Sequence, residues 1–269
     1  MDFYSLDEVK KHCSKNTTGA WISDNLLWRP VSPYVTWAFA NLRLSSVFAV
    51  SLSIVFIAGA ALLLFSNGKT ALVAAAIGIE VYALLDHVDG ELARFEMGRL
   101  GKTISRVGHF LDLLAHKISV IAMFAIGWTV ADTTGNDLYT AATFMLCFFI
   151  LGPSNEPANQ IVIEEAKKTN MSDALNKLKA FSVTRDPKAD DVRPNRFLMF
   201  LNELFGFPGW LHLIVAACLL DAFAGPLSML GSDYLYREAL IILLLPIYVA
   251  KFLFALRWYW KIMLSIHHG

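Results

Sequence analysis

Charged residues are scarce in this chain. Only 17% of its 269 residues are Asp, Glu, Lys or Arg, whereas a soluble domain has about 25%. Hydrophobic residues make up 56%, and the charges are clustered, so long stretches hold almost none. This composition argues against an ordinary soluble domain and predicts a polytopic helical membrane protein.

An excess of charge of either sign is also absent. The 23 basic residues balance the 23 acidic ones, so net charge gives no indication of a nucleic-acid partner. The three cysteines, Cys13, Cys147 and Cys218, are isolated and form no Cys-x-x-Cys pair. We therefore predict packing residues and no disulfide framework. The polar N-terminal segment has no signal-peptide core, and the first span is expected to act as its own insertion signal.

Six apolar stretches each approach the ~20 residues that cross a bilayer as a helix. They are expected at residues 45–66, 70–94, 104–131, 137–158, 208–231 and 236–260. Before them, Ser5 to Glu8 has the pattern of a capping box that opens a short helix. Trp28, Arg29 and Trp37 in residues 25–43 are typical of an amphipathic helix at the membrane surface. The predicted fold is therefore an all-α integral membrane protein with six transmembrane helices and an N-terminal juxtamembrane helix.

The chain is predicted to have three parts. A cytoplasmic segment with the juxtamembrane helix covers residues 1–44, the six-helix transmembrane domain covers 45–262, and a tail covers 263–269. A polar loop at about 159–206 interrupts the transmembrane domain. Basic residues gather in the N-terminal segment, the 94–106 turn, this loop and the C-terminal end. The positive-inside rule therefore predicts that both termini and the site lie on the cytoplasmic side, and we expect a prokaryotic plasma membrane.

Two stripes of polar residues meet where the second span turns into the third. The first stripe, with offsets 0, 3, 4, 7 and 8, consists of Asp86, Asp89, Gly90, Ala93 and Arg94. The second, with offsets 0, 4 and 8, consists of Gly108, Asp112 and His116. Each spacing places its residues on one helical face. Two antiparallel helices would thus point three carboxylates and an imidazole at each other.

Such a cluster indicates function. An ionisable residue inside a span costs about 2.5–3.5 kcal/mol on insertion scales. Oxygen-rich clusters suit Mg²⁺ or Mn²⁺, which keep phosphate oxygens as further ligands. A metal held here would clamp a pyrophosphate and stabilise a leaving group, with Arg94 as the phosphate partner. The residues by themselves predict an intramembrane metal–phosphate site near the cytoplasmic face.

The same residues resemble the signature of the CDP-alcohol phosphotransferase (CDP-alcohol phosphatidyltransferase) family. That signature is Asp-x2-Asp-Gly-x2-Ala-Arg, followed by Gly-x3-Asp-x3-Asp. The resemblance implies transfer of a phosphoalcohol (phosphatidyl or polar head-group phosphate) from a CDP-linked donor to a hydroxyl acceptor, with release of CMP. Phospholipid or related head-group biosynthesis is the implied role. CDP-diacylglycerol and a soluble CDP-alcohol both stay open as donors, the alcohol is undetermined, and a homodimer is expected.

The resemblance also implies roles for individual residues. A divalent metal, one or two Mg²⁺ or Mn²⁺ ions, would be bound by Asp86, Asp89, Asp112 and His116. The donor pocket would be lined by Gly90, Ala93, Arg94 and Gly108, and Gly108 would allow close helix approach. The catalytic residues would be Asp112 and His116.

Three departures from the family pattern are visible. His116 stands where the family has a fourth aspartate, which is thought to deprotonate the attacking hydroxyl. An imidazole can serve as this base near neutral pH, but it is a poorer ligand for Mg²⁺, so a softer metal or a single metal is an alternative. The turn between Arg94 and Gly108 is longer than in the family, and Ser45-Ser46 stands near the place of its Pro-Asn.

Two other functions are compatible with the sequence. Carboxylates and histidines at i, i+3 and i+4 across two spans would also suit a divalent-metal transporter. The His116 change is compatible with a catalytically inactive family member that acts as a binding protein. Outside the cluster, we expect the ion pairs Glu80–Lys117 and Asp221–Lys251, and we expect neither His87 nor His109 to be a ligand.

Overall fold

The computed structural model describes residues 3–13, 28–103, 105–151, 204–205, 209–229 and 232–267. In chain order, their elements are α1 (Leu6–Cys13), α2 (Ser32–Asn41), α3 (Ser46–Leu63), α4 (Lys69–Leu100), α5 (Arg106–Thr134), α6 (Leu138–Leu151), α10 (Gly209–Phe223), β1 (Leu227–Met229), β2 (Ser232–Tyr234) and α11 (Tyr236–His267). The predicted loop at 159–206 lies outside the described residues, apart from 204–205.

Among the residues that the structure describes, three helices, α3, α4 and α5, are long and apolar enough to cross a membrane. Within the described residues, α6 and α10 are apolar but shorter. The predicted helical membrane architecture agrees with these elements, while six spans stay a prediction. At a rise of 1.5 Å per residue, the 32-residue α4 is about 48 Å long. It exceeds the ~30 Å hydrocarbon core, so part of it must lie at the level of the head groups or beyond.

The junction between α4 and α5 is a turn with capped helix ends. Helix α4 continues past the predicted residue 94 to Leu100 and is capped by Gly101, whose φ of +64° favours glycine. Helix α5 begins after Ser105, whose side chain accepts a hydrogen bond from the Gly108 N–H at 3.2 Å. Arg94 therefore lies on a helix rather than in the turn.

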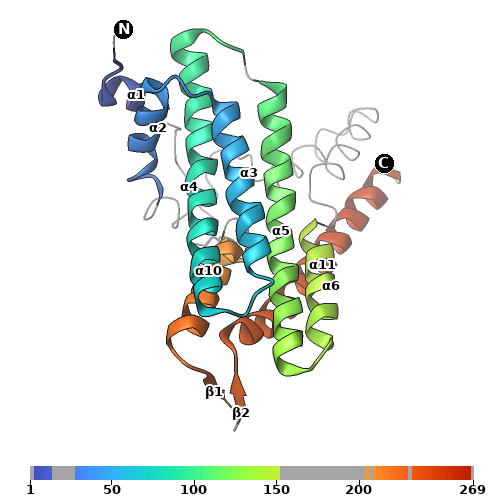
Figure 1. The fold of residues 1–269 in the computed structure, drawn as a ribbon. Coiled ribbons are helices and arrows are strands. Elements are labelled where there is room, and N and C mark those ends of the chain that lie inside the picture. The colour runs from blue at the N-terminus through green and yellow to red at the C-terminus, as the bar shows by residue number, and fades with distance from the viewer. Residues whose placement is uncertain are drawn as a thin grey trace.

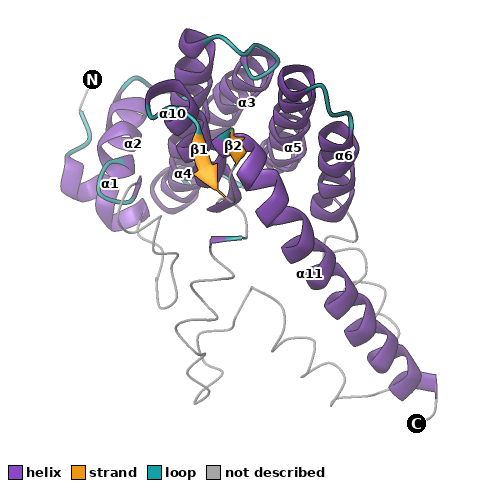
Figure 2. Cartoon of the chain, turned by 90° about the horizontal axis from the view of Figure 1, so that it is seen from below, coloured by secondary structure: helices purple, strands orange, loops and turns teal. Residues whose placement is uncertain are grey.

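The helices form a bundle in which α3 packs against both α4 and α5 (Figure 1). On its other side α4 contacts α10, while α6 packs on α5 and α11 contacts both α6 and α10. The short helices α1 and α2 pack on α4 at the end that carries the α4–α5 turn. The β1–β2 hairpin lies at the opposite end (Figure 1), and the view from below shows it between α10 and the start of α11 (Figure 2).

One glycine is decisive for the packing of α5 on α6. A Cβ added at Gly127 would lie only 1.8 Å from Thr143 Oγ1. Small residues allow membrane helices to approach in this way. At Gly108, where the sequence predicted a close approach, an added Cβ would meet Ser105 and Val47 at an ordinary 3.6 Å.

The N-terminal helices are attached to α4 through a buried carboxylate. Glu91 is only 9% exposed and accepts hydrogen bonds from Ser32 Oγ at 2.7 Å and Thr36 Oγ1 at 2.6 Å. Cys13 Sγ donates to the Glu91 backbone carbonyl at 3.3 Å. Burial raises the pKa of the Cys13 thiol to about 12, so it stays protonated and packs as predicted. Like Cys147 and Cys218, it is a free cysteine.

Removing this carboxylate should loosen the N-terminal helices. We expect Glu91→Ala to lower the free energy of unfolding by about 2–4 kcal/mol, because two buried hydroxyls lose a charged acceptor. Thermal unfolding in detergent would measure the change as a fall in Tm. The matched control is Glu8→Ala, which removes an exposed ion pair between α1 and Arg99 of α4 and should change Tm little. Equal effects of the two substitutions would contradict the role of Glu91.

The first helix follows the sequence prediction closely, whereas α2 does not. Ser5 Oγ accepts a hydrogen bond from the Glu8 N–H at 3.1 Å, which is one half of the predicted capping box. Helix α2 covers only Ser32–Asn41 of the predicted 25–43, and residues 25–27 lie outside the described part of the chain. Pro33 in its first turn is compatible with a helix start there.

The fifth predicted span, 208–231, is wrong at its C-terminal end. Helix α10 ends at Phe223, and Gly225 with a φ of +72° and Pro226 lead the chain into β1. The strands pair antiparallel, with Leu227 opposite Tyr234. The all-α prediction is therefore corrected by one small hairpin. A glycine in the left-handed region followed by proline cannot continue a helix, and the apolar composition of the stretch concealed this break.

The two predicted ion pairs are also wrong. Asp221 is paired with Arg237, whose Nε lies 2.6 Å from Asp221 Oδ2, and it accepts the backbone N–H of Tyr236 at the start of α11. Lys251 instead donates to the Phe205 carbonyl at 3.0 Å. Glu80 Oε1 lies 3.0 Å from Nδ1 of His212 on α10. The predictions paired residues expected at similar depths in the membrane. Depth alone does not determine an ion-pair partner, because the rotation of each helix decides which neighbouring helix its side chains face.

Candidate active site

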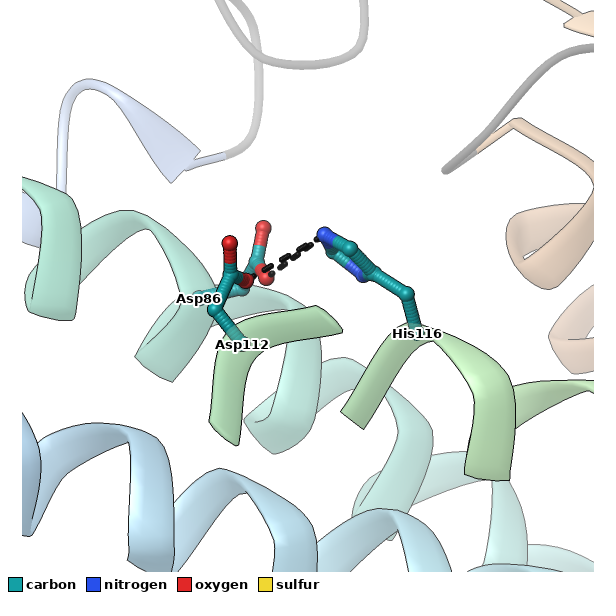
Figure 3. A group of neighbouring side chains, drawn as sticks. All are labelled: Asp86, Asp112 and His116. Carbon is teal, nitrogen blue, oxygen red and sulfur yellow. Dashed lines mark ion pairs between the residues drawn. The ribbon is translucent and has the colours of Figure 1, made fainter. Parts of the chain in front are cut away.

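Three side chains of the predicted cluster converge between α4 and α5. Asp86 extends from α4, and Asp112 and His116 extend from the first turns of α5 (Figure 3). His116 Nε2 lies 3.3 Å from Asp112 Oδ1 and 3.8 Å from Asp86 Oδ1. One ligand atom from each residue lies within 4.8 Å of the other two. The cluster therefore brings together two carboxylates and an imidazole from two helices.

The imidazole of His116 is held on its other side by a buried tyrosine. Tyr82 Oη lies 2.9 Å from His116 Nδ1, and Tyr82 is completely buried. Tyr82 is one helical turn before Asp86 on α4, so it belongs to the same face. Sequence reasoning missed this contact: the spacing of Tyr82 from Asp86 places both residues on one face of α4 but does not give the partner on α5.

Asp89 contributes to an adjoining cavity of about 170 Å³. The residues that line this cavity are Ser46, Val50, Asp89, Gly90, Ala93, Ser105, Gly108, His109 and Asp112. Five of them were predicted site residues, and Asp112 belongs to both the cavity and the cluster. One helix face of α4, the start of α5 and the start of α3 thus form its walls.

The carboxylate of Asp89 is not fully satisfied by the protein. Its Oδ2 atom is buried and has no hydrogen-bond partner. A buried carboxylate oxygen without a partner is unfavourable by several kcal/mol, and a bound cation is one way to compensate it. Together with the oxygen-rich donor set of Asp86 and Asp112, this fits a divalent metal ion.

Arg94 does not line the cavity. Its Nε donates to the Cys13 backbone carbonyl at 3.0 Å, so the guanidinium links α4 to the end of α1. It still lies beside the predicted pocket, because a Cβ added at Gly90 would meet Arg94 Nη1 at 3.3 Å. Gly90 therefore leaves room for the arginine next to the cavity.

The cavity also contains residues that the sequence did not single out. Ser46 lines it and donates through Oγ to Glu96 Oε2 at 2.8 Å. Glu96 in turn accepts a hydrogen bond from Lys102 at 3.0 Å, so the long α4–α5 turn is tied to the start of α3. His109 was expected to lie off the stripes, yet it forms part of the wall. His87 contacts the Ala83 carbonyl of its own helix at 2.9 Å.

The family model for CDP-alcohol phosphatidyltransferase matches residues 39–184. This match covers more than half of the chain and includes α3, α4, α5 and the whole cluster. The chain belongs to the CDP-alcohol phosphatidyltransferase family. No curated protein matches the sequence. Membership indicates transfer of a phosphoalcohol from a CDP-alcohol and a role as a transferase.

Proposed function

We propose that the protein is a metal-dependent transferase that moves a phosphoalcohol from a CDP-linked donor to an acceptor hydroxyl and releases CMP. The observation that carries the proposal is the convergence of Asp86, Asp112 and His116 within 4.8 Å, beside a cavity lined by Asp89. The candidate membrane-spanning helices α4 and α5 carry these groups, so the reaction takes place at the membrane. Phospholipid or related head-group synthesis is the corresponding role.

The metal ion, Mg²⁺ or Mn²⁺, would be held by Asp86, Asp89, Asp112 and His116. When bound, it would neutralise charge on the donor's pyrophosphate and stabilise the departing CMP. The carboxylates provide the hard oxygen ligands that such ions take. Family membership supports a dependence on divalent metal, and the unpartnered Oδ2 of Asp89 supports a cation at this position.

The chain's own residues would position the donor and move one proton. The cavity walls at Gly90, Ala93 and Gly108 carry little or no side chain, which leaves space for the nucleotide. Arg94 lies beside this space and carries a positive charge suited to phosphate. The phosphate that carries the alcohol forms a new bond to the acceptor oxygen, and its bond to the oxygen of CMP breaks. The hydroxyl proton goes to Asp112 or His116 as the general base.

The product depends on which alcohol is the acceptor and on whether the CDP-linked donor is a lipid or a soluble molecule. CDP-diacylglycerol would approach from the bilayer around α3, α4 and α5, whereas a soluble CDP-alcohol would enter from the aqueous side. We propose that this side is the cytoplasm, that the membrane is a prokaryotic plasma membrane, and that the protein forms a homodimer with six spans per chain.

CMP release by the purified protein tests this function. The protein in detergent should release CMP from one or more members of a panel of CDP-donors when alcohols and Mg²⁺ or Mn²⁺ are supplied. Because a metal is required to stabilise the leaving group, EDTA should abolish release and added metal should restore it. Comparing CDP-diacylglycerol with soluble CDP-alcohols identifies the donor class. Metal flux into proteoliposomes without any nucleotide, together with no CMP release, would instead support a transporter.

A further inference from the structure

The contact between Tyr82 and His116 crosses from α4 to α5 and orients the imidazole. Nδ1 of His116 faces the Tyr82 hydroxyl at 2.9 Å, while Nε2 faces Asp112 and Asp86 at 3.3 and 3.8 Å. Tyr82 has no exposed surface, and Ala115 and Ser119 beside His116 on α5 are also completely buried. A closely packed tyrosine cannot easily move away from its partner, so the ring has one preferred orientation.

This orientation has a consequence for the proton on the ring. A neutral imidazole carries one N–H, and the hydrogen bond made by one ring nitrogen determines which form is present. If Nε2 binds a metal through its lone pair, the proton is on Nδ1 and is donated to the Tyr82 oxygen. Residues that accept this second N–H orient metal-binding histidines in many proteins and raise their basicity.

We propose that Tyr82 is a positioning residue that fixes His116 as a nitrogen ligand, so that the site prefers a transition-metal ion such as Mn²⁺ over Mg²⁺. This inference rests on the proposed function, since it assumes that a divalent metal occupies the cluster. An imidazole nitrogen suits transition-metal ions better than it suits Mg²⁺, and Mn²⁺ is the member of the transition-metal series that also takes the carboxylate and water ligands of Mg²⁺.

The geometry also separates the roles of Asp112 and His116. A carboxylate has two oxygens, so Asp112 can bind the metal through one and accept a proton through the other. His116 has one nitrogen directed at Tyr82 and one directed at the carboxylates. If Nε2 held the metal, Asp112 would be the residue left to take the acceptor's proton.

The affinity for Mn²⁺ alone provides a test without catalysis. Free Mn²⁺ can be measured by electron paramagnetic resonance as the purified protein is titrated, and the affinity for Mg²⁺ follows from displacement of Mn²⁺. Tyr82→Phe keeps the buried ring and removes only the hydroxyl. It should weaken Mn²⁺ binding by about 10–100-fold with much less effect on Mg²⁺, and an unchanged Tm would show that the fold is intact.

A double-mutant cycle separates positioning from a general structural effect. In the His116→Ala background there is no imidazole to orient, so Tyr82→Phe should leave Mn²⁺ affinity unchanged. His116→Asp should shift the metal preference toward Mg²⁺, because it replaces nitrogen by carboxylate oxygen. An equal loss from Tyr82→Phe in both backgrounds would overturn the inference, as would a wild-type protein that binds Mg²⁺ as tightly as Mn²⁺.

Failure of the inference can be distinguished from failure of the proposed function. Metal-dependent CMP release with equal use of Mg²⁺ and Mn²⁺ would leave the transferase in place and remove the role assigned to Tyr82. Absence of both metal binding and CMP release would remove both.

Discussion

Replacing Asp89 by asparagine should reduce metal-dependent CMP release by at least about 100-fold. This corresponds to about 3 kcal/mol, within the several kcal/mol by which a bound metal stabilises a reacting phosphate. The substitution keeps the size of the side chain and removes the charge that would hold the cation. It should be measured as the initial rate of CMP release at saturating donor and metal, and as Mn²⁺ affinity.

The same substitution should not destabilise the protein. Asp89 Oδ2 is buried without a hydrogen-bond partner. Removing the charge therefore removes the desolvation energy of a buried carboxylate from the metal-free protein. We therefore expect the metal-free Tm to stay constant or rise while activity is lost. The control is Asp132→Asn, which alters an exposed carboxylate near the other end of α5 and should leave both properties unchanged. Full activity of Asp89→Asn would show that this carboxylate holds no essential metal.

Replacing His116 by alanine should reduce transfer by about 10²–10⁴-fold, the range that a general acid–base group contributes. A loss of this size is expected whether His116 accepts the proton itself or binds the metal beside Asp112, because both roles act on the reacting groups. CDP-donor binding at saturating metal should persist, since Asp86, Asp89 and Asp112 remain. Single-turnover CMP release and calorimetric binding of the donor would separate chemistry from binding.

The matched control for His116 is His87. It lies on α4 next to Asp86 in sequence, but its Nδ1 contacts the Ala83 carbonyl of its own helix. His87→Ala should therefore retain most of the activity. Normal turnover by His116→Ala would remove His116 from the chemistry and would transfer both candidate roles to the aspartates.

Much of the site could be predicted because it depends on local periodicity. Asp86 and Asp89 are three residues apart on one continuous helix, and Asp112 and His116 are four apart on the next. Helical geometry alone places each pair on one face. The position of Gly90 and Ala93 beside Asp89 in the cavity wall follows from the same periodicity of α4, and Gly108 shares a face with Asp112 on α5.

Helical periodicity could not predict which aspartates lie in the cluster with His116 and which line the cavity. Asp86 lies in the cluster with His116, whereas Asp89 lines the cavity and Asp112 belongs to both. The rotation and offset of α5 relative to α4 determine this division, and α3 packs against both of them. The same factors placed Tyr82 against His116, a contact between residues 34 positions apart.

By itself, the sequence determined the helical membrane class, the two polar stripes and the family, because hydropathy and spacing act within single segments. Tertiary structure alone decided the partners of Glu80 and Asp221, the hydrogen bonds of Glu91 to α2, and the direction of Arg94 toward α1. Each of these contacts joins two different helices. Their geometry depends on how the helices pack side by side, and no property of one helix specifies the rotation of its neighbour.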